Sequence, residues 1–375
     1  MDIQQLSKKF GINAERGEGG NFPVFLSRMK GRRVVALADL NTEKYAAPIL
    51  QALERAKVPC KLFTLPEYEP VADERTVQAA VRAAEGYDYL LAVGAGTLND
   101  VAKYAGFLTK KGSGVFATAP SMDGFTSGVT PLIENGFKIT RPAKTAEDVL
   151  IDDAVLKSAP RIMIGAGVGD ILAKYCCLTD WRISSYLTGE EYNTAAADLM
   201  YDAVRACDGS IPDLIAGRDG GVNKLMDALL ISGYAMVIAG NSRPASGAEH
   251  HMSHFLEMDF LRRGERIPLH GVKVGLGTAV SLQLYHTLKD RAPFRGCEKV
   301  YAEAEKLPKA EEVLNTLKSL GCPTRFSALG VSQGTVRDML KNAYKIRDRF
   351  TILTLYCTFG LMTERVIDEL IEKFY

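Results

Sequence analysis

The sequence has 375 residues, a length at which one hydrophobic core usually splits, and we therefore expect two domains. Its 46 lysine and arginine residues balance 45 aspartate and glutamate residues, so the composition gives no electrostatic footprint for nucleic acid or for an anionic membrane surface. We expect the chain to act on a small molecule and to have no nucleic-acid partner.

The cysteine content and the N-terminal segment bear on location. Seven cysteines, an odd number without a C-x-x-C pair, argue against a disulfide framework or a zinc ribbon and suit a reducing compartment. The opening stretch MDIQQLSKKFGINAERGEGG lacks the apolar core of a signal peptide, and no run approaches the roughly 18 apolar residues that a membrane span requires. We predict a cytoplasmic protein without a membrane span.

The first part of the chain alternates short apolar runs with amphipathic helical stretches. The expected strands lie in RVVALAD (33–39), KLFTL (61–65), YLLAVG (89–94), GVFATAP (114–120) and EDVLIDDAVLKSAP (147–160). The expected helices cover residues 41–57, 73–86 and 97–112. Short β-rich runs separated by helices predict βαβ units, in which a parallel sheet is covered on both faces.

After Pro160 the pattern changes to long helical stretches. In GDILAKYCCLTDW (169–181), KLMDALLISGYAMVIAG (224–240) and residues 335–374 the apolar side chains recur mostly every three or four positions, which is the spacing of amphipathic helices. The sequence therefore predicts an α/β domain with a parallel sheet over residues 1–162 and an all-α domain over residues 163–375.

The predicted sheet has an unusual arrangement of nucleotide-binding signals. In an ordinary dinucleotide fold a glycine-rich turn follows the first strand, and an acid about 20 residues later binds the ribose. Here the acid Asp39 ends the first predicted strand, and the glycine-rich loop VGAGTLND comes after a later one. Gly94 and Gly96 would let backbone amides approach a pyrophosphate, and Thr97 opens a helix whose N-terminus favours anions.

A third stretch, TAPSMDGFTSG, follows the next predicted strand. It places Thr118, Ser121, Asp123 and Ser127 at the carboxyl edge of the sheet, where open α/β sheets bind their ligands. Glycines at a strand-to-helix turn also serve steric needs, and small hydroxyl residues also form turns and caps. The agreement of three stretches at strand ends favours a nucleotide site over coincidence.

GAGVGD, residues 165–170, resembles a dinucleotide loop more closely than VGAGTLND does. It stands at the predicted domain boundary and not inside a βαβ unit, so we interpret it as unrelated to the nucleotide. We expect Asp170 to begin the following helix, where an acid would suit the cap or the helix dipole.

Four of the five histidines lie close together in SRPASGAEHHMSHFLEM and the following IPLHGVKVG. On a helix, His250 and His254 share one face, and so do His251 and His254. Two imidazoles and a carboxylate form a common site for a divalent transition metal, and His270, expected on a loop, could supply one ligand. The opposing interpretation is a set of ordinary surface histidines, since no H-E-x-x-H signature is present.

Together these motifs resemble the glycerol-1-phosphate dehydrogenase family, within the superfamily of metal-dependent polyol dehydrogenases and dehydroquinate synthases. SRPASGAEHHMSH carries the strongest resemblance, and GVGDILAKYCCLTDW and PSMDGFTSG are similar to two further motifs. The resemblance extends from about Asp39 to YKIRDRFTIL near the C-terminus. It implies a dehydroquinate synthase-like fold and a cytoplasmic enzyme of phospholipid biosynthesis that interconverts dihydroxyacetone phosphate and sn-glycerol 1-phosphate with NAD or NADP. It also implies a homo-oligomer, a dimer or larger.

The resemblance also assigns roles to residues. It implies that Asp170, His250 and His270 bind one divalent metal, zinc or nickel with iron as a further option, and that Asp123 and His254 act on the substrate. The implied cofactor-binding residues are Asp39, Gly94, Ala95, Gly96, Thr97, Leu98, Thr118, Ala119, Pro120, Ser121 and Ser127. The chain departs from the family at Ala95, which replaces the middle glycine of a G-G-G run, and at Ala173, which replaces a serine.

Some alternatives remain open from the sequence. The substrate could be glycerol or another unphosphorylated polyol, and a dehydroquinate synthase-type lyase or a non-catalytic nucleotide-binding protein are more distant options. His251 has no counterpart in the family motif. Arg243 is one candidate for binding the substrate phosphate, although a lone arginine is more often structural.

Overall fold

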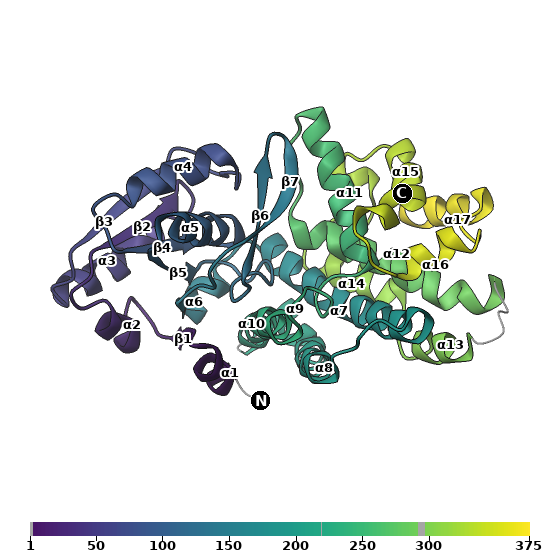
Figure 1. The fold of residues 1–375 in the computed structure, drawn as a ribbon, viewed down its shortest axis with the longest axis horizontal. Coiled ribbons are helices and arrows are strands. Elements are labelled where there is room, and N and C mark those ends of the chain that lie inside the picture. The colour runs from purple at the N-terminus through teal and green to yellow at the C-terminus, as the bar shows by residue number, and fades with distance from the viewer. Residues whose placement is uncertain (1–2, 219, 292–296) are drawn as a thin grey trace. The chain divides into compact units, whose positions relative to one another are not determined.

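The computed structural model describes residues 3–218, 220–291 and 297–375. The chain forms two compact units (Figure 1). The first comprises Met1–Pro160 and Val222–Tyr234, and the second comprises Arg161–Gly221 and Ala235–Tyr375.

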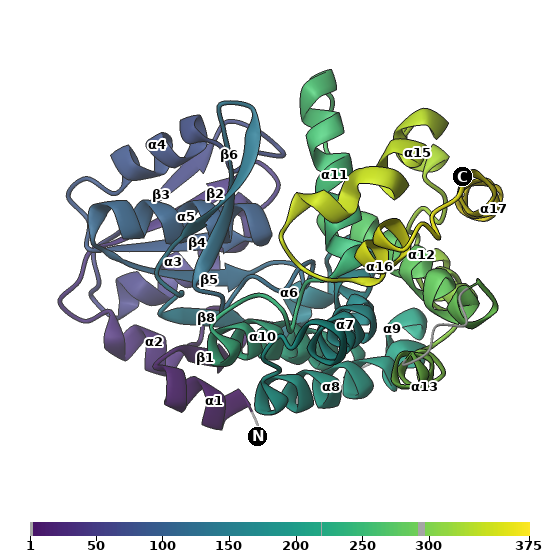
Figure 2. The same cartoon turned by 45° about the vertical axis from the view of Figure 1, so that its right-hand side comes forward.

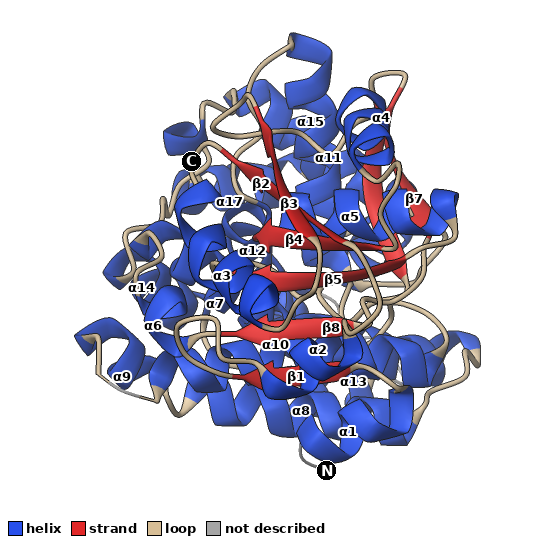
Figure 3. Ribbon diagram, turned by 90° about the vertical axis from the view of Figure 1, so that its left-hand side faces the viewer, coloured by secondary structure: helices blue, strands red, loops and turns tan. Residues whose placement is uncertain are grey.

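The first unit is built on a parallel six-stranded sheet with the order β1-β8-β5-β4-β2-β3 (Figure 3). Its strands are β1 (Asn13–Arg16), β2 (Val34–Asp39), β3 (Cys60–Leu65), β4 (Tyr89–Gly94), β5 (Gly112–Ala117) and β8 (Asp148–Ile151). An antiparallel hairpin adds β6 (Val129–Glu134) and β7 (Phe137–Pro142). Strands β2 and β4 are buried at every position, as expected for central strands covered on both faces.

Helices cover both faces of this sheet. They are α1 (Ile3–Phe10), α2 (Pro23–Arg28), the 3-10 turn η1 (Glu43–Tyr45), α3 (Ala46–Arg55), α4 (Glu74–Ala83), α5 (Gly96–Thr109) and α6 (Asp153–Lys157). Phe22, Phe25 and Ile49, from α2, α3 and the residue before α2, pack with alternate residues of β2 and β4 into one core. Helix α5 packs against β4 and β5 and is joined by α4. The predicted α/β architecture is confirmed.

All regular secondary structure among the described residues of the second unit is helical (Figure 2). Its helices are α7 (Arg161–Thr188), α8 (Thr194–Asp208), α9 (Ile211–Ala216), α11 (Ala248–Arg263), α12 (His270–Arg291), α13 (Glu298–Ala304), α14 (Ala310–Ser319), η2 (Ser327–Leu329), α15 (Gln333–Asn342), η3 (Ala343–Ile346), α16 (Ile352–Thr358) and α17 (Glu364–Phe374). Helix α10 (Gly221–Ala239) contributes residues to both units. The all-α prediction is confirmed for this part of the chain.

The start of α7 differs from the prediction. The helix begins at Arg161, so GAGVGD is helical and Asp170 lies inside the helix instead of capping it. The glycines permit direct backbone packing between α7 and α12: a Cβ atom on Gly169 would lie 2.3 Å from the carbonyl oxygen of Gly271, and one on Gly271 would lie 1.8 Å from that of Ala166. Close packing thus outweighs the helix propensity that each glycine costs, about 1 kcal/mol relative to alanine.

The position of His270 also differs. It is the first residue of α12 and not a loop residue. The amides of Val272 and Lys273 donate to the carbonyl of Leu269, so the helical hydrogen bonding starts immediately after Pro268. The imidazole is therefore held on a helix end, which restricts its orientation more than a loop would.

Two helices are long and apolar enough to cross a membrane by length and composition alone, namely α7 and α10. The most apolar part of α7 is 83% buried and that of α10 is 56% buried. Long apolar helices of this kind also form the cores of soluble proteins, so length and composition are weak evidence for a span.

Candidate active site

The carboxyl ends of three parallel strands carry the predicted nucleotide-binding residues. Asp39 ends β2, Gly94 ends β4, and Thr118 follows β5 directly. The amide of Thr118 donates to the carbonyl of Gly94 at 3.1 Å, so the ends of β4 and β5 are joined. The structure thus brings these residues to one edge of the sheet in the first unit.

Asp39 is a buried carboxylate with a defined set of donors. Its Oδ1 accepts hydrogen bonds of 2.9 Å from the amides of Asn41 and Thr42 and from the Thr42 hydroxyl. Burial, partly offset by these hydrogen bonds, raises the pKa of Asp39. The local turn therefore orients the carboxyl group that the sequence assigned to the ribose.

Helix α5 starts at Gly96 without a side-chain cap, since Ala95 occupies the N-cap position. Its first amides are therefore not satisfied by a capping side chain, which fits an anion such as a pyrophosphate. The glycines also have a steric role: a Cβ atom on Gly94 would lie 2.4 Å from Cδ1 of Leu98, and one on Gly96 would lie 2.9 Å from Cγ of Met122.

The loop after β5 is held by a buried lysine that the sequence analysis missed. Lys103, on α5, donates to the carbonyls of Gly124 (2.9 Å) and Val129 (2.9 Å) and to the hydroxyl of Ser127 (3.2 Å). Burial lowers its pKa. The only sequence signal was a lysine on the apolar face of a predicted helix. Ser127 is thereby engaged inside the loop, where it stabilises the loop conformation.

The other residues assigned to this loop lie around the same turn. Asp123 accepts a 2.7 Å hydrogen bond from the hydroxyl of Ser232 on α10. Thr118 and Ser121 are buried polar residues with 6% and 8% exposure. Thr97 and Leu98 occupy the first turn of α5, and Ala119 and Pro120 connect Thr118 to Ser121.

In the second unit, three helices place Asp170, His250 and His270 together. The ligand atoms of these side chains all lie within 4.8 Å of one another, and no other such group of three occurs among residues 3–218, 220–291 and 297–375. Asp170 is fully buried, His250 is 5% exposed, and the His270 side chain is 28% exposed. A carboxylate and two imidazoles, one of them open to solvent, suit a divalent transition metal with vacant coordination positions.

Two glutamates orient the histidines, and the sequence analysis did not identify either. Glu249 Oε1 lies 2.8 Å from Nδ1 of His250, and Glu257 lies 3.3 Å from Nδ1 of His270 and 3.0 Å from Nδ1 of His254. A carboxylate at Nδ1 favours a proton there and leaves Nε2 able to bind a metal. The available signal was the position of each acid, next to His250 and three residues after His254.

Charges surround the Asp170 carboxylate. Lys174, one turn later on α7, donates to Asp170 Oδ1 at 2.8 Å, and His250 Nε2 lies 3.6 Å from the same oxygen. Burial opposes ionisation, but Lys174 and the two imidazoles lower the pKa of Asp170. For His250, burial is outweighed by Asp170 and Glu249, which raise its pKa. Asp170 and His250 can therefore carry charge although they are buried inside the helical unit.

The remaining histidines of α11 have different environments. The His254 ring centroid lies 6.1 Å from that of His270 and 6.4 Å from that of His250, and its Nε2 is 3.4 Å from Nη2 of Arg347. His251 is fully buried, and neither of its ring nitrogens has a hydrogen-bond partner among the described residues. Burial, followed by the charges of Arg347 and Arg349, lowers the pKa of His251 to about 2.

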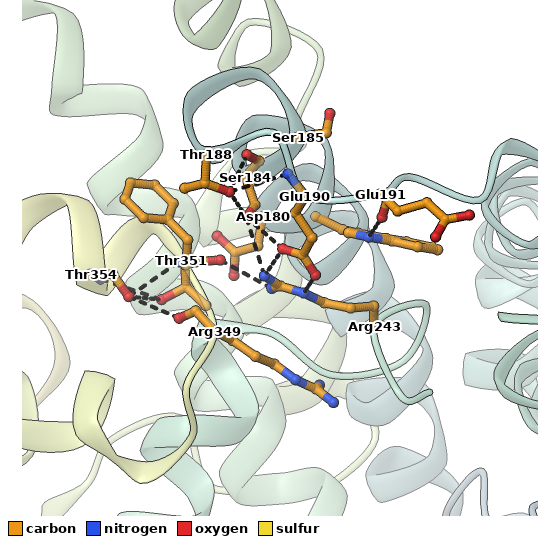
Figure 4. Close-up of polar contacts among 12 residues, drawn as sticks. Asp180, Ser184, Ser185, Thr188, Glu190, Glu191, Arg243, Arg349, Thr351 and Thr354 are labelled. Carbon is orange, nitrogen blue, oxygen red and sulfur yellow. Dashed lines mark hydrogen bonds and ion pairs between the residues drawn. The ribbon is translucent and has the colours of Figure 1, made fainter. Parts of the chain in front are cut away.

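Arg243 is a structural residue in this fold (Figure 4). Its Nε donates to Glu190 at 2.7 Å, its Nη1 donates to the carbonyl of Phe350 at 3.0 Å, and its Nη2 contacts Glu190 and Ser184. The side chain is 3% exposed. Because Glu190 balances its charge, Arg243 braces the loop before α11 and is a poor candidate for the substrate phosphate.

A buried aspartate fixes the start of α11. Asp180, on α7, accepts hydrogen bonds from the amides of Ala248 and Ile352, both at 2.7 Å, and from the Tyr285 hydroxyl at 2.6 Å. Burial, followed by the nearby charge of Glu249, raises the pKa of Asp180 to about 7. Asp180 therefore sets the position from which His250 and His254 project.

Comparisons with known proteins agree with this geometry. Residues 13–160 match the family model of iron-containing alcohol dehydrogenases. Glycerol-1-phosphate dehydrogenases from Bacillus velezensis and Bacillus subtilis are 39% and 34% identical to the chain, each alignment covering 88% of it and 86% of the relative. The enzyme from Thermococcus kodakarensis is 34% identical over 75% of the chain and 72% of its own length.

Solved structures with the same fold are more distant in sequence. A probable glycerol dehydrogenase from Sinorhizobium meliloti superposes with a TM-score of 0.68 at 20% identity, covering 96% of this chain and 95% of the other. A 1,3-propanediol oxidoreductase superposes with a TM-score of 0.69 at 14% identity, covering 96% and 97%. These superpositions establish the fold, and the closer sequence relatives establish that the chain belongs to the glycerol-1-phosphate dehydrogenase family.

Proposed function

We propose that the protein is an NAD(P)-linked sn-glycerol-1-phosphate dehydrogenase that interconverts dihydroxyacetone phosphate and sn-glycerol 1-phosphate. The observation that carries the proposal is the convergence of Asp170, His250 and His270 in a chain whose relatives bear that activity in their names. A divalent metal there would supply Lewis-acid polarisation of the substrate carbonyl, and the nicotinamide would supply or accept the hydride.

The chain's own residues provide binding and orientation. Glu249 and Glu257 hold the imidazoles through Nδ1, so that the Nε2 atoms are available to a metal. His254 is one helical turn beyond His250 and outside the group of three, and it would form a hydrogen bond with a hydroxyl of the substrate. Asp123 is the second residue proposed to contact the substrate, oriented by the hydroxyl of Ser232.

The cofactor-binding role is proposed for the carboxyl edge of the sheet in the first unit. The uncapped start of α5 would bind the pyrophosphate, and Asp39 would bind the adenosine ribose. A buried carboxylate disfavours a 2′-phosphate, so NAD is the expected preference over NADP. The names of the relatives allow either cofactor.

The identity of the metal, the location and the assembly are finer parts of the proposal. Aspartate and histidine ligands suit zinc or nickel, and iron remains an option because the matching family model describes iron-containing enzymes. All seven cysteines are free thiols, which suits a cytoplasmic location. A homo-oligomer, a dimer or larger, is expected from the family resemblance and is checked by light scattering.

The main alternative is a dehydrogenase of glycerol or another unphosphorylated polyol. Solved structures with such names share the fold but are 20% identical or less, whereas the relatives at 34–39% identity act on a phosphorylated substrate according to their names. The proposal therefore favours the phosphorylated substrate.

Steady-state kinetics and metal removal test this proposal. The purified protein should oxidise NADH with dihydroxyacetone phosphate far faster than with dihydroxyacetone, and should lose activity after dialysis against a chelator. Activity should return with zinc, nickel or ferrous ion added singly under anaerobic conditions. Full activity of the metal-free protein would refute the metal role, and equal activity with both substrates would favour the polyol alternative.

A further inference from the structure

A pocket of about 600 Å³ in the second unit has a strongly cationic wall. Its lining includes Arg243, Lys345, Arg347 and Arg349, together with one glutamate and one aspartate. Arg243 is already paired with Glu190, as described above. Arg347 and Arg349, in the segment between η3 and α16, are the cations whose purpose the fold does not explain.

One hydroxyl holds these two arginines side by side. Ser242 Oγ accepts from Nη1 of Arg347 at 3.3 Å and from Nη2 of Arg349 at 2.8 Å. Arg349 also donates through Nη1 to the carbonyl of Ser246 at 3.3 Å. In Figure 4 the guanidinium of Arg349 points away from the Glu190–Arg243 pair. Two planar cations are thus fixed next to each other by neutral acceptors.

The surrounding acids do not balance this charge, and Asp348, the aspartate of the pocket lining, forms no ion pair with either arginine among the described residues. Glu190 is engaged by Arg243, and Glu257, which faces Arg347, also contacts His254 and His270. Burial lowers the pKa of Arg347, and burial with the charges of Arg347 and Arg243 lowers the pKa of Arg349 to about 10. Buried cations of like charge are costly unless an anion joins them.

Two further side chains of this region, His251 and Ser246, carry no negative charge. His251 is fully buried, and neither of its ring nitrogens has a hydrogen-bond partner among the described residues. The Ser246 hydroxyl is buried and has no hydrogen-bond partner among the described residues, although its own carbonyl accepts from Arg349. Neither side chain therefore balances the positive charge of the two arginines.

The arginine pair is one imidazole away from the proposed metal ligands. Arg347 Nη2 lies 3.4 Å from Nε2 of His254, whose ring centroid is 6.1 Å from that of His270. Consider a small substrate whose carbonyl lies at the Asp170–His250–His270 group and whose anionic end is a few bonds away. Its anionic end would extend past His254 to the guanidinium groups. This order of groups matches a three-carbon ketone phosphate.

We propose that Arg347 and Arg349 form the subsite for the phosphate of the substrate, with Ser242 as the residue that positions them. The proposal rests on the proposed function, because it takes dihydroxyacetone phosphate as the substrate. Two guanidinium forks can bind a phosphate through paired charge-assisted hydrogen bonds, which a single lysine cannot reproduce. The subsite determines preference for a phosphorylated over a free polyol.

The test is the ratio of kcat/KM for dihydroxyacetone phosphate to kcat/KM for dihydroxyacetone. In Arg347→Gln and Arg349→Gln this ratio should fall about 10- to 100-fold, and the inhibition constant of inorganic phosphate should rise. Arg349→Lys, which keeps the charge but loses the fork, should fall between wild type and Arg349→Gln. The control is Arg337→Gln on α15, an arginine paired with Glu364 and outside the pocket lining, and its ratio should stay at the wild-type value.

Metal content and melting temperature show whether each variant is folded. If an arginine variant does not fold, Ser242→Ala removes the shared acceptor while keeping both charges, and its ratio should also fall. A wild-type protein without preference for the phosphorylated substrate would refute the proposed function itself. A wild-type preference that survives in folded arginine variants would refute the subsite alone. A changed preference between NADPH and NADH, with the substrate ratio unchanged, would show that the arginines bind a cofactor phosphate instead.

Discussion

Replacing Glu249 with glutamine separates metal binding from folding. Glu249 is fully buried, and its Oε1 accepts from the amide of Gly247 at 2.7 Å and faces Nδ1 of His250 at 2.8 Å. A glutamine oxygen can accept both hydrogen bonds, so the geometry is kept while the negative charge is lost. The imidazole then becomes a weaker ligand, because its Nδ1 proton is no longer stabilised by a carboxylate.

The magnitude follows from these contacts. Loss of an orienting carboxylate typically weakens a metal site by about 10- to 100-fold, or about 1.4–2.7 kcal/mol. The metal-free protein should respond differently. The charge-assisted bonds become neutral ones, but the repulsion that Glu249 exerts on buried Asp180 is removed. These effects oppose each other, and we expect the melting temperature to change by no more than about 4 °C.

The assay is a competition titration against a chromophoric chelator, with thermal melting of the metal-free protein in parallel. Glu249→Ala is the matched comparison. It leaves the Gly247 amide and the His250 ring without an acceptor, at about 1–3 kcal/mol for each buried group. Unchanged metal affinity in Glu249→Gln would refute the orienting role. A melting temperature that falls as far as in Glu249→Ala would show that Glu249 serves folding only.

Four further changes address the two candidate sites. His254→Asn should keep its metal, as measured by elemental analysis. Its kcat/KM in steady-state kinetics should fall by a factor that corresponds to about 2–4 kcal/mol of lost transition-state stabilisation. Asp39→Ser should reduce the preference for NAD over NADP about tenfold, measured as a ratio of kcat/KM values. Ala95→Gly should tighten NADH binding in a fluorescence titration, because it removes a methyl group that would crowd a pyrophosphate in the proposed site. Since the pKa of buried His251 is about 2, the unfolded chain alone gains a proton below about pH 6.5. Wild type should therefore lose about 2 kcal/mol relative to His251→Asn between pH 6.5 and 5, measured by denaturation.

Each of these expectations has a contrary result. An empty metal site in His254→Asn would mean that the ligand and substrate roles on α11 are wrongly assigned. Identical cofactor ratios in Asp39→Ser and wild type would remove the basis for an NAD preference. Weaker NADH binding by Ala95→Gly would mean that the loop has adapted to the methyl group. Parallel pH profiles of wild type and His251→Asn would show that His251 is protonated in the fold.

The sequence predicted the sheet well because its central strands are almost wholly apolar. The runs ending at Asp39 and Gly94 are buried on both faces. Such continuous apolar runs predict a central strand without information from distant residues. Strand β1 was missed because NAER has no apolar alternation and gains its place by pairing with β8. The hairpin β6–β7 was also missed, within a stretch read only for its polar residues.

Glycine misled the prediction of α7 because it has two opposite uses. In GAGVGD the sequence pattern favoured a turn, yet these residues lie in a helix whose backbone meets that of α12 at Gly271. Contact between residues more than 100 positions apart in the chain, such as Gly169 and Gly271, cannot be read from local periodicity. The same limit hid Arg347 and Arg349, whose partners are Ser242 and His254.

The three histidines of α11 show how a fold gives chemically different roles to identical neighbours. His250 and His254 are four residues apart and therefore share a face, whereas His251 is turned by about 100° from His250. The two on the shared face each have a carboxylate at Nδ1, Glu249 or Glu257, while His251 has no hydrogen-bond partner among the described residues.

Burial is similar for His250 and His251, so burial alone does not decide the pKa. Burial lowers the pKa of both rings, but Asp170 and Glu249 outweigh it for His250, whereas the two arginines add to it for His251. A histidine cluster in a sequence therefore marks a candidate site, and the carboxylates at Nδ1 separate His250, His254 and His270 from His251, which has no such partner among the described residues.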